Sequence, residues 1–417
     1  MVNGLEIPSI NSLPRVHSKR LPNRDERRQA TYILKTRPHL NTHQKGYLIL
    51  TDRLKCDALE RLRQHHDGTI LTVQDLSYPQ SFRQQIQRTI LEQKPRYVAI
   101  APRISYCGEL MLLGILDVLL TCGSHSNTPQ LEVQPSFLIA SNDAAFVKLI
   151  DQSIQYSTKP ANPITICQVR SHIETRSLQK SIMLRRYFED KKLKSGTPII
   201  ALYEKSALEN GAPMLEPDAS NWTLLTDNEL SSNTSIDEHE SLNPKCFKSF
   251  PNDAQKALSD SNLWILHGHG RPGMSCSIDV DALDLIEMTS KVILAGSCYS
   301  AAPLIPNVPP HPSYSRRISF VHKAIDRGAV CAFGHLRQNT GFPHLFPILE
   351  HLIQDGSTIG EAYQRLINAI IAIRGFHIND FQARVQHDAP NGDFNFPQNA
   401  LLYIMIGDPA LKLFHSN

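Results

Sequence analysis

Strand-like and helix-like segments alternate along most of this 417-residue chain, and this alternation restricts its fold more than any other feature. The strand-like segments are short apolar runs bounded by polar or turn-forming residues, the pattern of strands buried on both faces. They lie at 46–52, 69–76, 96–102, 135–141, 162–169, 197–204, 262–266, 291–295 and 329–334. The alternation predicts an α/β fold with mostly parallel sheets flanked by helices.

The segments between these runs show helical periodicity, with apolar residues three and four positions apart. We expect helices at 54–66, 81–93, 110–120, 144–155, 177–192, 252–260, 280–288 and 320–326. The last helix is expected to begin at Thr358, because Glu361 follows it at the spacing of a capping box. A final apolar run, ALLYIMIGDPALKLF, closes the chain.

The alternation occurs in two consecutive runs, which divide the chain into expected parts. A first α/β subdomain is expected at 46–160 and a second at 161–417. Within the second, the segment 206–251 is rich in polar residues and proline and is expected to form a long loop or insertion. Residues 1–45 hold nine basic and three acidic side chains. They are expected to form a solvated, partly disordered arm, and the alternative is a tail that docks a regulatory partner.

The composition and charge of the chain disfavour several classes of protein. The formal net charge of +3 gives no strong field, so nucleic acid is not an expected partner. The first residues lack the pattern of a secretory signal. The longest apolar run, 110–120, is too short to cross a bilayer, so no membrane association is expected. The eight cysteines are scattered without a C-x-x-C pair, which favours reduced thiols and a cytoplasmic location.

The stretch WILHGHGRPGM, residues 264–274, fits three kinds of site. Its glycines match G-x-G-x-x-G, the pattern that cradles the pyrophosphate of a dinucleotide. Its two histidines, His267 and His269, match a pair of metal ligands. A histidine between glycines at the end of a buried strand also suits the catalytic base of a cysteine peptidase.

The residues that follow the two histidines disfavour the first two interpretations. A dinucleotide fingerprint must open a helix, and here Pro272 and Gly273 interrupt any helical start. A zinc site needs more ligands than the histidine pair. Cys276 and Cys298 are suitable thiols, but an H-x-H-x-D-H pattern and a C-x-x-C pair are both absent. A zinc-dependent hydrolase therefore stays open as an alternative.

The third interpretation draws on a second strand. The apolar runs 263–266 and 292–295 are joined through one short expected helix, a βαβ arrangement that places their carboxyl ends on the same edge of a sheet. Those ends deliver His269 and Cys298, which are 29 residues apart. The imidazole would take the proton of the thiol and later give one to the leaving amine. The backbone N–H groups of Gly270 and Cys298 would form an oxyanion hole.

Several stretches together resemble the gingipain family of clan CD cysteine peptidases, which have the caspase-like fold. They are LWILHGHG and VILAGSCYSA around the expected dyad, then RGAVCAFG, FPILEHLIQDGSTIGEAYQRL and YIMIGDPALKLF. The GYLILTD region is similar to the first α/β subdomain of that family. The resemblance covers residues 46–415 in order.

The resemblance implies a cysteine endopeptidase with two tandem α/β subdomains, of which 161–417 is the catalytic one. It implies that Cys298 is the nucleophile, that His269 is the general base and acid, and that Gly270 supplies an oxyanion-hole amide together with Cys298. His267 is expected to be structural. Asp408, in the G-D-P turn, is expected to be a turn or cap residue.

The chain also departs from that family. No propeptide or sorting domain is recognisable, which favours an intracellular regulatory or defence protease acting on protein or peptide substrates. The substrate-binding residues stay unassigned, including any acidic residue that would select Arg or Lys at the cleaved position. The dyad requires no cofactor, and calcium, which is common in the family, has no assigned ligands here. The alternative from another class is a catalytically inactive caspase-like scaffold or sensor that acts through the basic arm.

Overall fold

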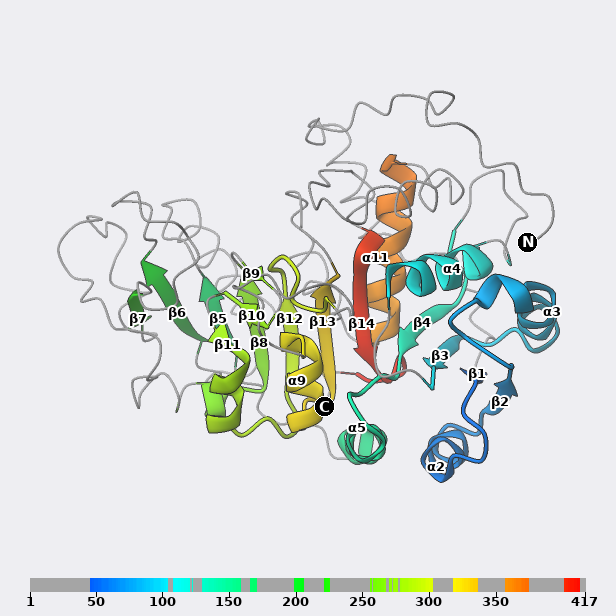
Figure 1. Cartoon of the computed structure of the whole chain (residues 1–417), viewed down its shortest axis with the longest axis horizontal. Helices are drawn as coiled ribbons and strands as arrows, with labels where there is room; N and C mark the ends of the chain where they lie inside the picture. The colour runs from blue at the N-terminus through cyan, green and yellow to red at the C-terminus, as the bar shows by residue number, and fades with distance from the viewer. Residues whose placement is uncertain are drawn as a thin grey trace, which may run out of the picture.

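The computed structural model is an α/β structure built on one large sheet (Figure 1). It describes residues 46–103, 108–120, 122, 130–158, 166–170, 199–205, 221–225, 256, 258–267, 270–271, 273–276, 278–302, 318–336, 357–374 and 401–412. Eleven strands follow one another in the order β2-β1-β3-β4-β14-β13-β12-β8-β5-β6-β7. Most neighbouring strands are parallel, so the predicted α/β fold with a mostly parallel sheet is confirmed.

The first segment contributes four parallel strands to one end of the sheet. They are β1 (Tyr47–Thr51), β2 (Thr69–Thr72), β3 (Tyr97–Ala101) and β4 (Gln134–Phe137). The helices that connect or follow them are α2 (Asp57–His65), the 3-10 turn η2 (Pro79–Phe82), α3 (Arg83–Gln93), α4 (Glu109–Leu120) and α5 (Asp143–Thr158). Every strand–helix alternation expected between 46 and 158 is therefore present.

The second segment supplies the other end of the sheet. Its strands are β5 (Ile166–Arg170), β6 (Ile199–Lys205), β7 (Asn221–Leu225), β8 (Leu263–His267), β12 (Val292–Ala295) and β13 (Cys331–His335). Among themselves these strands pair in parallel, except that β7 lies antiparallel to β6 at the edge. The longer helices described in this segment are α9 (Phe320–Arg327) and α11 (Ile359–Arg374).

The last strand of the chain joins the two ends of the sheet. Strand β14 (Tyr403–Gly407) pairs antiparallel with β13 and meets β4 at one parallel register point, Ile406 with Phe137. Its burial is complete over all five residues. The strands of both expected subdomains thus form one continuous sheet, and the terminal apolar run fills its centre.

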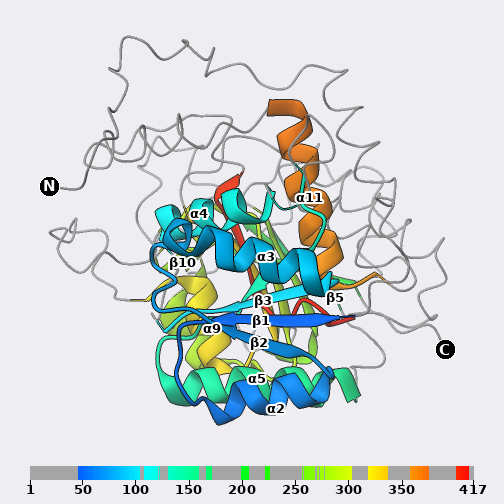
Figure 2. The ribbon, with the colours of Figure 1, turned by 90° about the vertical axis from the view of Figure 1, so that its right-hand side faces the viewer.

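Helices cover both faces of this sheet. Helices α3, α4 and α11 lie on one side and α2, α5 and α9 on the other, as Figure 2 shows from the end of the sheet. Such double covering explains why the strands carry almost continuous apolar runs instead of alternating ones. In β8 and β12, for example, each residue from Leu263 to Leu266 and from Val292 to Ala295 is buried.

The start of α11 contains one of the two hydrogen bonds of the predicted capping box. The hydroxyl of Thr358 accepts a hydrogen bond from the backbone N–H of Glu361 at 3.2 Å, as an N-cap should. The Glu361 carboxylate does not return to Thr358, because it is bound by the guanidinium of Arg365 one turn later. Thr358 instead donates its proton to the side chain of Gln134 in β4, at 2.9 Å.

Replacing Thr358 by alanine is expected to lower the free energy of unfolding by about 1 to 2 kcal/mol, because the cap is lost and the Gln134 carbonyl loses its donor. Urea unfolding of Thr358→Ala against the wild type measures the effect. Thr89→Ala is the matched control, since the Thr89 hydroxyl only bonds back to Gln85 on the exposed side of α3. Equal stability of the two variants would contradict the role of the cap.

The structure differs from the sequence-based expectations at two places. Five residues of the expected polar loop, Asn221–Leu225, form strand β7. The helix expected at 280–288 is a 3-10 helix, η5 (Val280–Leu285), and three short strands precede it. The arm 1–45, the helix expected at 177–192 and the rest of 206–251 lie outside the described residues.

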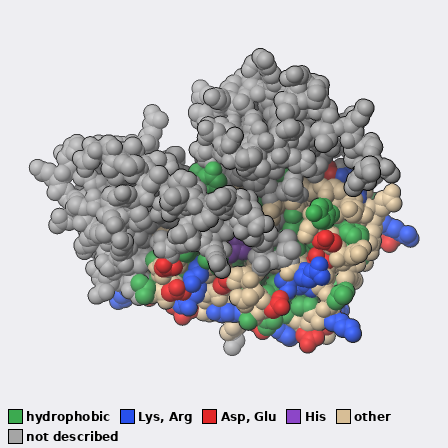
Figure 3. Space-filling model, in the orientation of Figure 1, with side chains coloured by type: hydrophobic (Ala, Val, Ile, Leu, Met, Phe, Trp, Pro, Cys, Tyr) green, Lys and Arg blue, Asp and Glu red, His purple; other side chains and the backbone are tan. Residues whose placement is uncertain are grey.

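The described surface carries mixed charge. On the face drawn in Figure 3, basic and acidic side chains of the described part lie interspersed, without a broad field of one sign. Within the described residues, no helix has both the length and the apolar character needed to cross a bilayer.

Candidate active site

The strands that precede the two expected catalytic residues are neighbours in the sheet. Strands β8 and β12 pair in parallel, from Val292 opposite Leu263 to Ala295 opposite Leu266. The pairing continues one step further, because the N–H of Gly296 donates to the carbonyl of Leu266 at 2.7 Å. The carboxyl ends of the two strands therefore lie side by side, as expected for a βαβ arrangement.

The glycines after β8 do not open a helix. Gly270 begins a small antiparallel sheet of β9 (Gly270–Arg271), β10 (Met274–Ser275) and β11 (Ile278–Asp279). Gly273, at φ +78°, makes the tight turn between β9 and β10. This geometry rules out the dinucleotide interpretation, which needs a helix N-terminus at the last glycine.

Gly270 packs directly against the turn that follows β12. A Cβ atom placed on Gly270 would collide with the carbonyl oxygen of Cys298 and would lie 2.8 Å from Cβ of Ser297. Only glycine fits such a close approach of two backbones. The structure thus brings together Gly270 and Cys298, the two residues expected to supply oxyanion-hole amides.

A methyl group at position 270 is expected to push β9 away from this turn. We expect Gly270→Ala to lower the free energy of unfolding by about 1 to 3 kcal/mol, the usual range for overpacking. Gly108→Ala is the control, because a Cβ atom there would meet nothing within 4 Å. Urea unfolding measures both, and a Gly270→Ala variant as stable as Gly108→Ala would contradict the close approach.

The turn that holds Cys298 has an unusual backbone. Tyr299, the next residue, has φ +56°, a left-handed conformation that non-glycine residues seldom adopt. Such conformations persist where the surrounding structure imposes them, and they concentrate at functional sites. The turn is closed by a hydrogen bond from the N–H of Ala302 to the carbonyl of Tyr299 at 3.1 Å.

Ser300 ties this turn to the neighbouring strand. Its buried hydroxyl donates to the carbonyl of Ser297 at 3.0 Å and accepts from the backbone N–H of His335, at the end of β13, also at 3.0 Å. Ser300 is a site residue that the sequence patterns do not predict. Its only signal is a serine two residues after the expected nucleophile in AGSCYS.

The ring of His335 lies beside the same strand ends. Burial lowers its pKa to about 3, so the imidazole is neutral at physiological pH. Its centroid lies 5.2 Å from that of Tyr403, whose hydroxyl donates to the carbonyl of Ala295 at 3.2 Å. His335 and Tyr403 therefore form an uncharged, closely packed pair next to the turn.

Cys298 differs from most other described thiols. It is partly exposed, and none of the six described cysteines forms a disulfide. Burial raises the pKa of Cys122 and Cys167 to about 12 and that of Cys331 well above its ordinary value, so these three thiols are inert at neutral pH. Cys56, also partly exposed, is the natural comparison for Cys298.

Three further residues belong to the expected sites: His267, His269 and Cys276. His269 lies outside the described residues, as does the side chain of His267 at the end of β8. Cys276, the fourth residue of the zinc interpretation, is buried after β10. Among the side chains that the structure describes, no three His, Cys, Asp or Glu gather as metal ligands would, but the zinc interpretation depends on the two histidines outside them.

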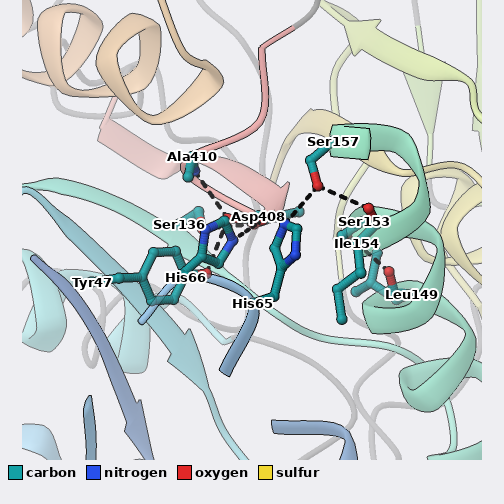
Figure 4. Close-up of polar contacts among 11 residues, drawn as sticks. Tyr47, His65, His66, Ser136, Leu149, Ser153, Ile154, Ser157, Asp408 and Ala410 are labelled. Carbon is teal, nitrogen blue, oxygen red and sulfur yellow. Dashed lines mark hydrogen bonds and ion pairs between the residues drawn. The ribbon is translucent and has the colours of Figure 1, made fainter. Parts of the chain in front are cut away.

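Asp408 has the role expected of a turn residue, with two additional partners. It accepts a hydrogen bond from the N–H of Ala410 at 3.0 Å, and further ones from the Tyr47 hydroxyl at 3.0 Å and from Nε2 of His66 at 2.7 Å (Figure 4). Burial raises the pKa of this carboxyl, but the hydrogen bond and charge of His66 outweigh that effect and leave the pKa below its ordinary value. Asp408 thus ties the C-terminal strand to β1 and α2.

Comparisons with known proteins find similarity to solved structures. No protein-family model matches the chain, and no curated protein matches it. A solved structure named "Structure of Protease" is similar to it, with a TM-score of 0.50 and 10% identity over 89% of this chain and 79% of that chain. This chain therefore shares the α/β fold of a solved protease structure.

Proposed function

We propose that this protein is a cysteine endopeptidase in which Cys298 is the nucleophile and His269 the general base and acid. The close packing of Gly270 against the Cys298 turn, at the shared carboxyl edge of β8 and β12, carries the proposal. Active sites of open α/β sheets lie at such edges. The likeness to a protease structure and the partly exposed thiol of Cys298 support it further.

The reaction follows from thiol and imidazole chemistry. His269 takes the proton of the Cys298 thiol, and the thiolate attacks the carbonyl carbon of the peptide bond. The C–S bond forms and the carbonyl oxygen becomes an oxyanion. When the intermediate collapses, the C–N bond breaks and His269 gives its proton to the leaving amine. Water, deprotonated by His269, then hydrolyses the thioester and restores the thiol.

The protein backbone contributes to the reaction by stabilising the oxyanion. We assign its stabilisation to the N–H groups of Gly270 and Cys298, which belong to the two backbones in contact. Removing one donor from such a hole typically costs 10²- to 10³-fold in kcat. A side chain at position 270 would separate the two donors, so the proposal also accounts for glycine there.

The setting of the enzyme is part of the proposal. Its substrates are proteins or peptides, and its compartment is the cytoplasm, consistent with the thiols that the structure describes. A regulatory or defence role, with a partner docking on the basic arm 1–45, extends the proposal beyond the described residues. The dyad itself needs no cofactor, and no residue is assigned to calcium.

Alkylation with a haloacetamide tests the dyad. Only a thiolate reacts quickly, so Cys298 is expected to be labelled at least about tenfold faster than Cys56 at neutral pH. His269→Ala is expected to remove that preference because the thiol loses its base. Peptide mapping by mass spectrometry measures both rates. Equal slow labelling of Cys298 and Cys56 in the wild type would refute the dyad and favour the inactive scaffold.

A further inference from the structure

We propose that Ser275 is a positioning residue for the oxyanion hole, acting through Ser297. The hydroxyl groups of the two serines form a hydrogen bond that joins strand β10 to Ser297, the residue before Cys298. This bond is called the hydroxyl pair. This inference rests on the proposed function, since it assigns a role within the same site.

The hydroxyl pair is short and fully enclosed. Oγ of Ser275 lies 2.5 Å from Oγ of Ser297, and both side chains have no exposed surface. A buried hydroxyl without a hydrogen-bond partner lowers the stability of the folded state. Each serine therefore holds the side chain of the other in place. Because the two residues are 22 positions apart, the bond links separate parts of the chain.

The pair closes a ring around the expected oxyanion hole. Ser275 lies opposite Gly270 in the pairing of β10 with β9, so the position of one sets the position of the other. Ser297 precedes Cys298 in the chain, and its Oγ would lie 2.9 Å from a Cβ on Gly270. From Gly270 the ring therefore passes through Ser275 and Ser297 to Cys298, whose carbonyl meets Gly270 again.

This ring determines the separation of the two N–H donors. Removing the hydroxyl pair takes away a buried hydrogen bond that holds β10, and through it β9, against the Cys298 turn, so the hairpin can shift relative to the turn. A displacement of about 1 Å is enough to lower a rate a hundredfold. Substrate binding outside the hole does not depend on the ring, so the effect belongs to kcat.

Three variants and one control test this role. Ser275→Ala, Ser297→Ala and the double variant each remove hydroxyls while retaining the Cβ atoms. Ser153→Ala is the control, because Ser153 is equally buried and its hydroxyl bonds only within α5, to Leu149. For each protein we would measure kcat and KM on a peptide substrate, the haloacetamide rate at Cys298, and the midpoint of thermal unfolding.

We expect each single variant to lose about 10- to 100-fold in kcat, with KM changed less than about threefold. The haloacetamide rate should stay within about twofold of wild type, because alkylation forms no oxyanion. The double variant should regain unfolding midpoint relative to the singles, since no hydroxyl is left unpaired, yet its kcat should remain low. A purely structural role would restore both together.

The outcomes separate this inference from the proposed function. If the wild type hydrolyses peptides and the serine variants match Ser153→Ala in kcat, the positioning role is refuted and the dyad stands. The same holds if the double variant recovers wild-type kcat. If the wild type neither hydrolyses peptides nor shows selective alkylation of Cys298, the proposed function fails and the positioning role fails with it.

Discussion

Replacing Cys298 by alanine is expected to lower the rate of peptide hydrolysis at least about a thousandfold, the scale seen when a catalytic nucleophile is removed. The reason is chemical, because no other group on the Cys298 turn can form the thioester. The fold should survive, since the side chain is only partly buried and alanine retains its Cβ atom. Initial rates on a peptide substrate, with near-ultraviolet circular dichroism as a check of folding, measure the effect.

Cys56→Ala is the matched control for this substitution. Cys56 is also a partly exposed thiol, but it stands before α2 on the first segment, and its loss should leave the rate unchanged. Hydrolysis that survives Cys298→Ala and disappears with a chelator would instead favour the zinc-dependent hydrolase. Survival without sensitivity to a chelator would contradict both mechanisms.

Replacing Asp408 by alanine is expected to lower the free energy of unfolding by about 3 to 5 kcal/mol, because several hydrogen-bond donors lose a buried carboxylate acceptor at once. The carboxylate is fully buried and holds Tyr47, His66 and the N–H of Ala410. Its removal leaves these donors without their acceptor at the point where the C-terminal strand meets the first segment. Urea unfolding at neutral pH measures the loss.

Asp143→Ala is the control for Asp408→Ala. The Asp143 carboxylate pairs with Arg53 at 2.8 Å, but its side chain is 91% exposed. Exposed pairs contribute about 0 to 1 kcal/mol, so this variant should remain close to wild type. A loss of the same size in both variants would contradict the account of the Asp408 cluster.

The same cluster predicts a pH dependence of stability. The pKa of Asp408 is lower in the folded protein than its ordinary value, which means that the unfolded chain binds the proton more readily. The stabilisation is therefore complete above about pH 4, the ordinary range of an Asp pKa, and it is lost as the pH falls through the lower folded pKa. The stability difference between wild type and Asp408→Asn should shrink below about pH 4. A difference that grows with acidity would contradict this sign.

The arrangement of the sheet near the site could be predicted from the sequence. It depends on local apolar patterns and on the rule that β-α-β connections are right-handed. Apolar runs at 263–266 and 292–295 predict two buried strands, and a short connection predicts that they are parallel neighbours. The pairing of β8 with β12 confirms this, and the contact of Gly270 with Cys298 follows from it. The glycine pattern alone was ambiguous, since its meaning depends on whether a helix follows.

Other features were not accessible from local patterns. The bond between His66 and Asp408 joins residues 342 positions apart, and no periodicity reports such a contact. The hydroxyl pair of Ser275 and Ser297 depends on the hairpin of β9 and β10, which no pattern in the sequence predicts. Strand β7 lies in a polar segment, where its pairing with β6 overrides the local composition.

The most direct test of the central claim is to look for the acyl-enzyme itself. A peptide ester makes formation of the thioester fast relative to its hydrolysis, so acid quenching during turnover should trap it. Mass spectrometry of the digested protein is expected to find the acyl mass on the peptide that contains Cys298, and to find none in Cys298→Ala. Hydrolysis that proceeds without any covalent adduct, or with the adduct on another residue, would contradict the proposed mechanism.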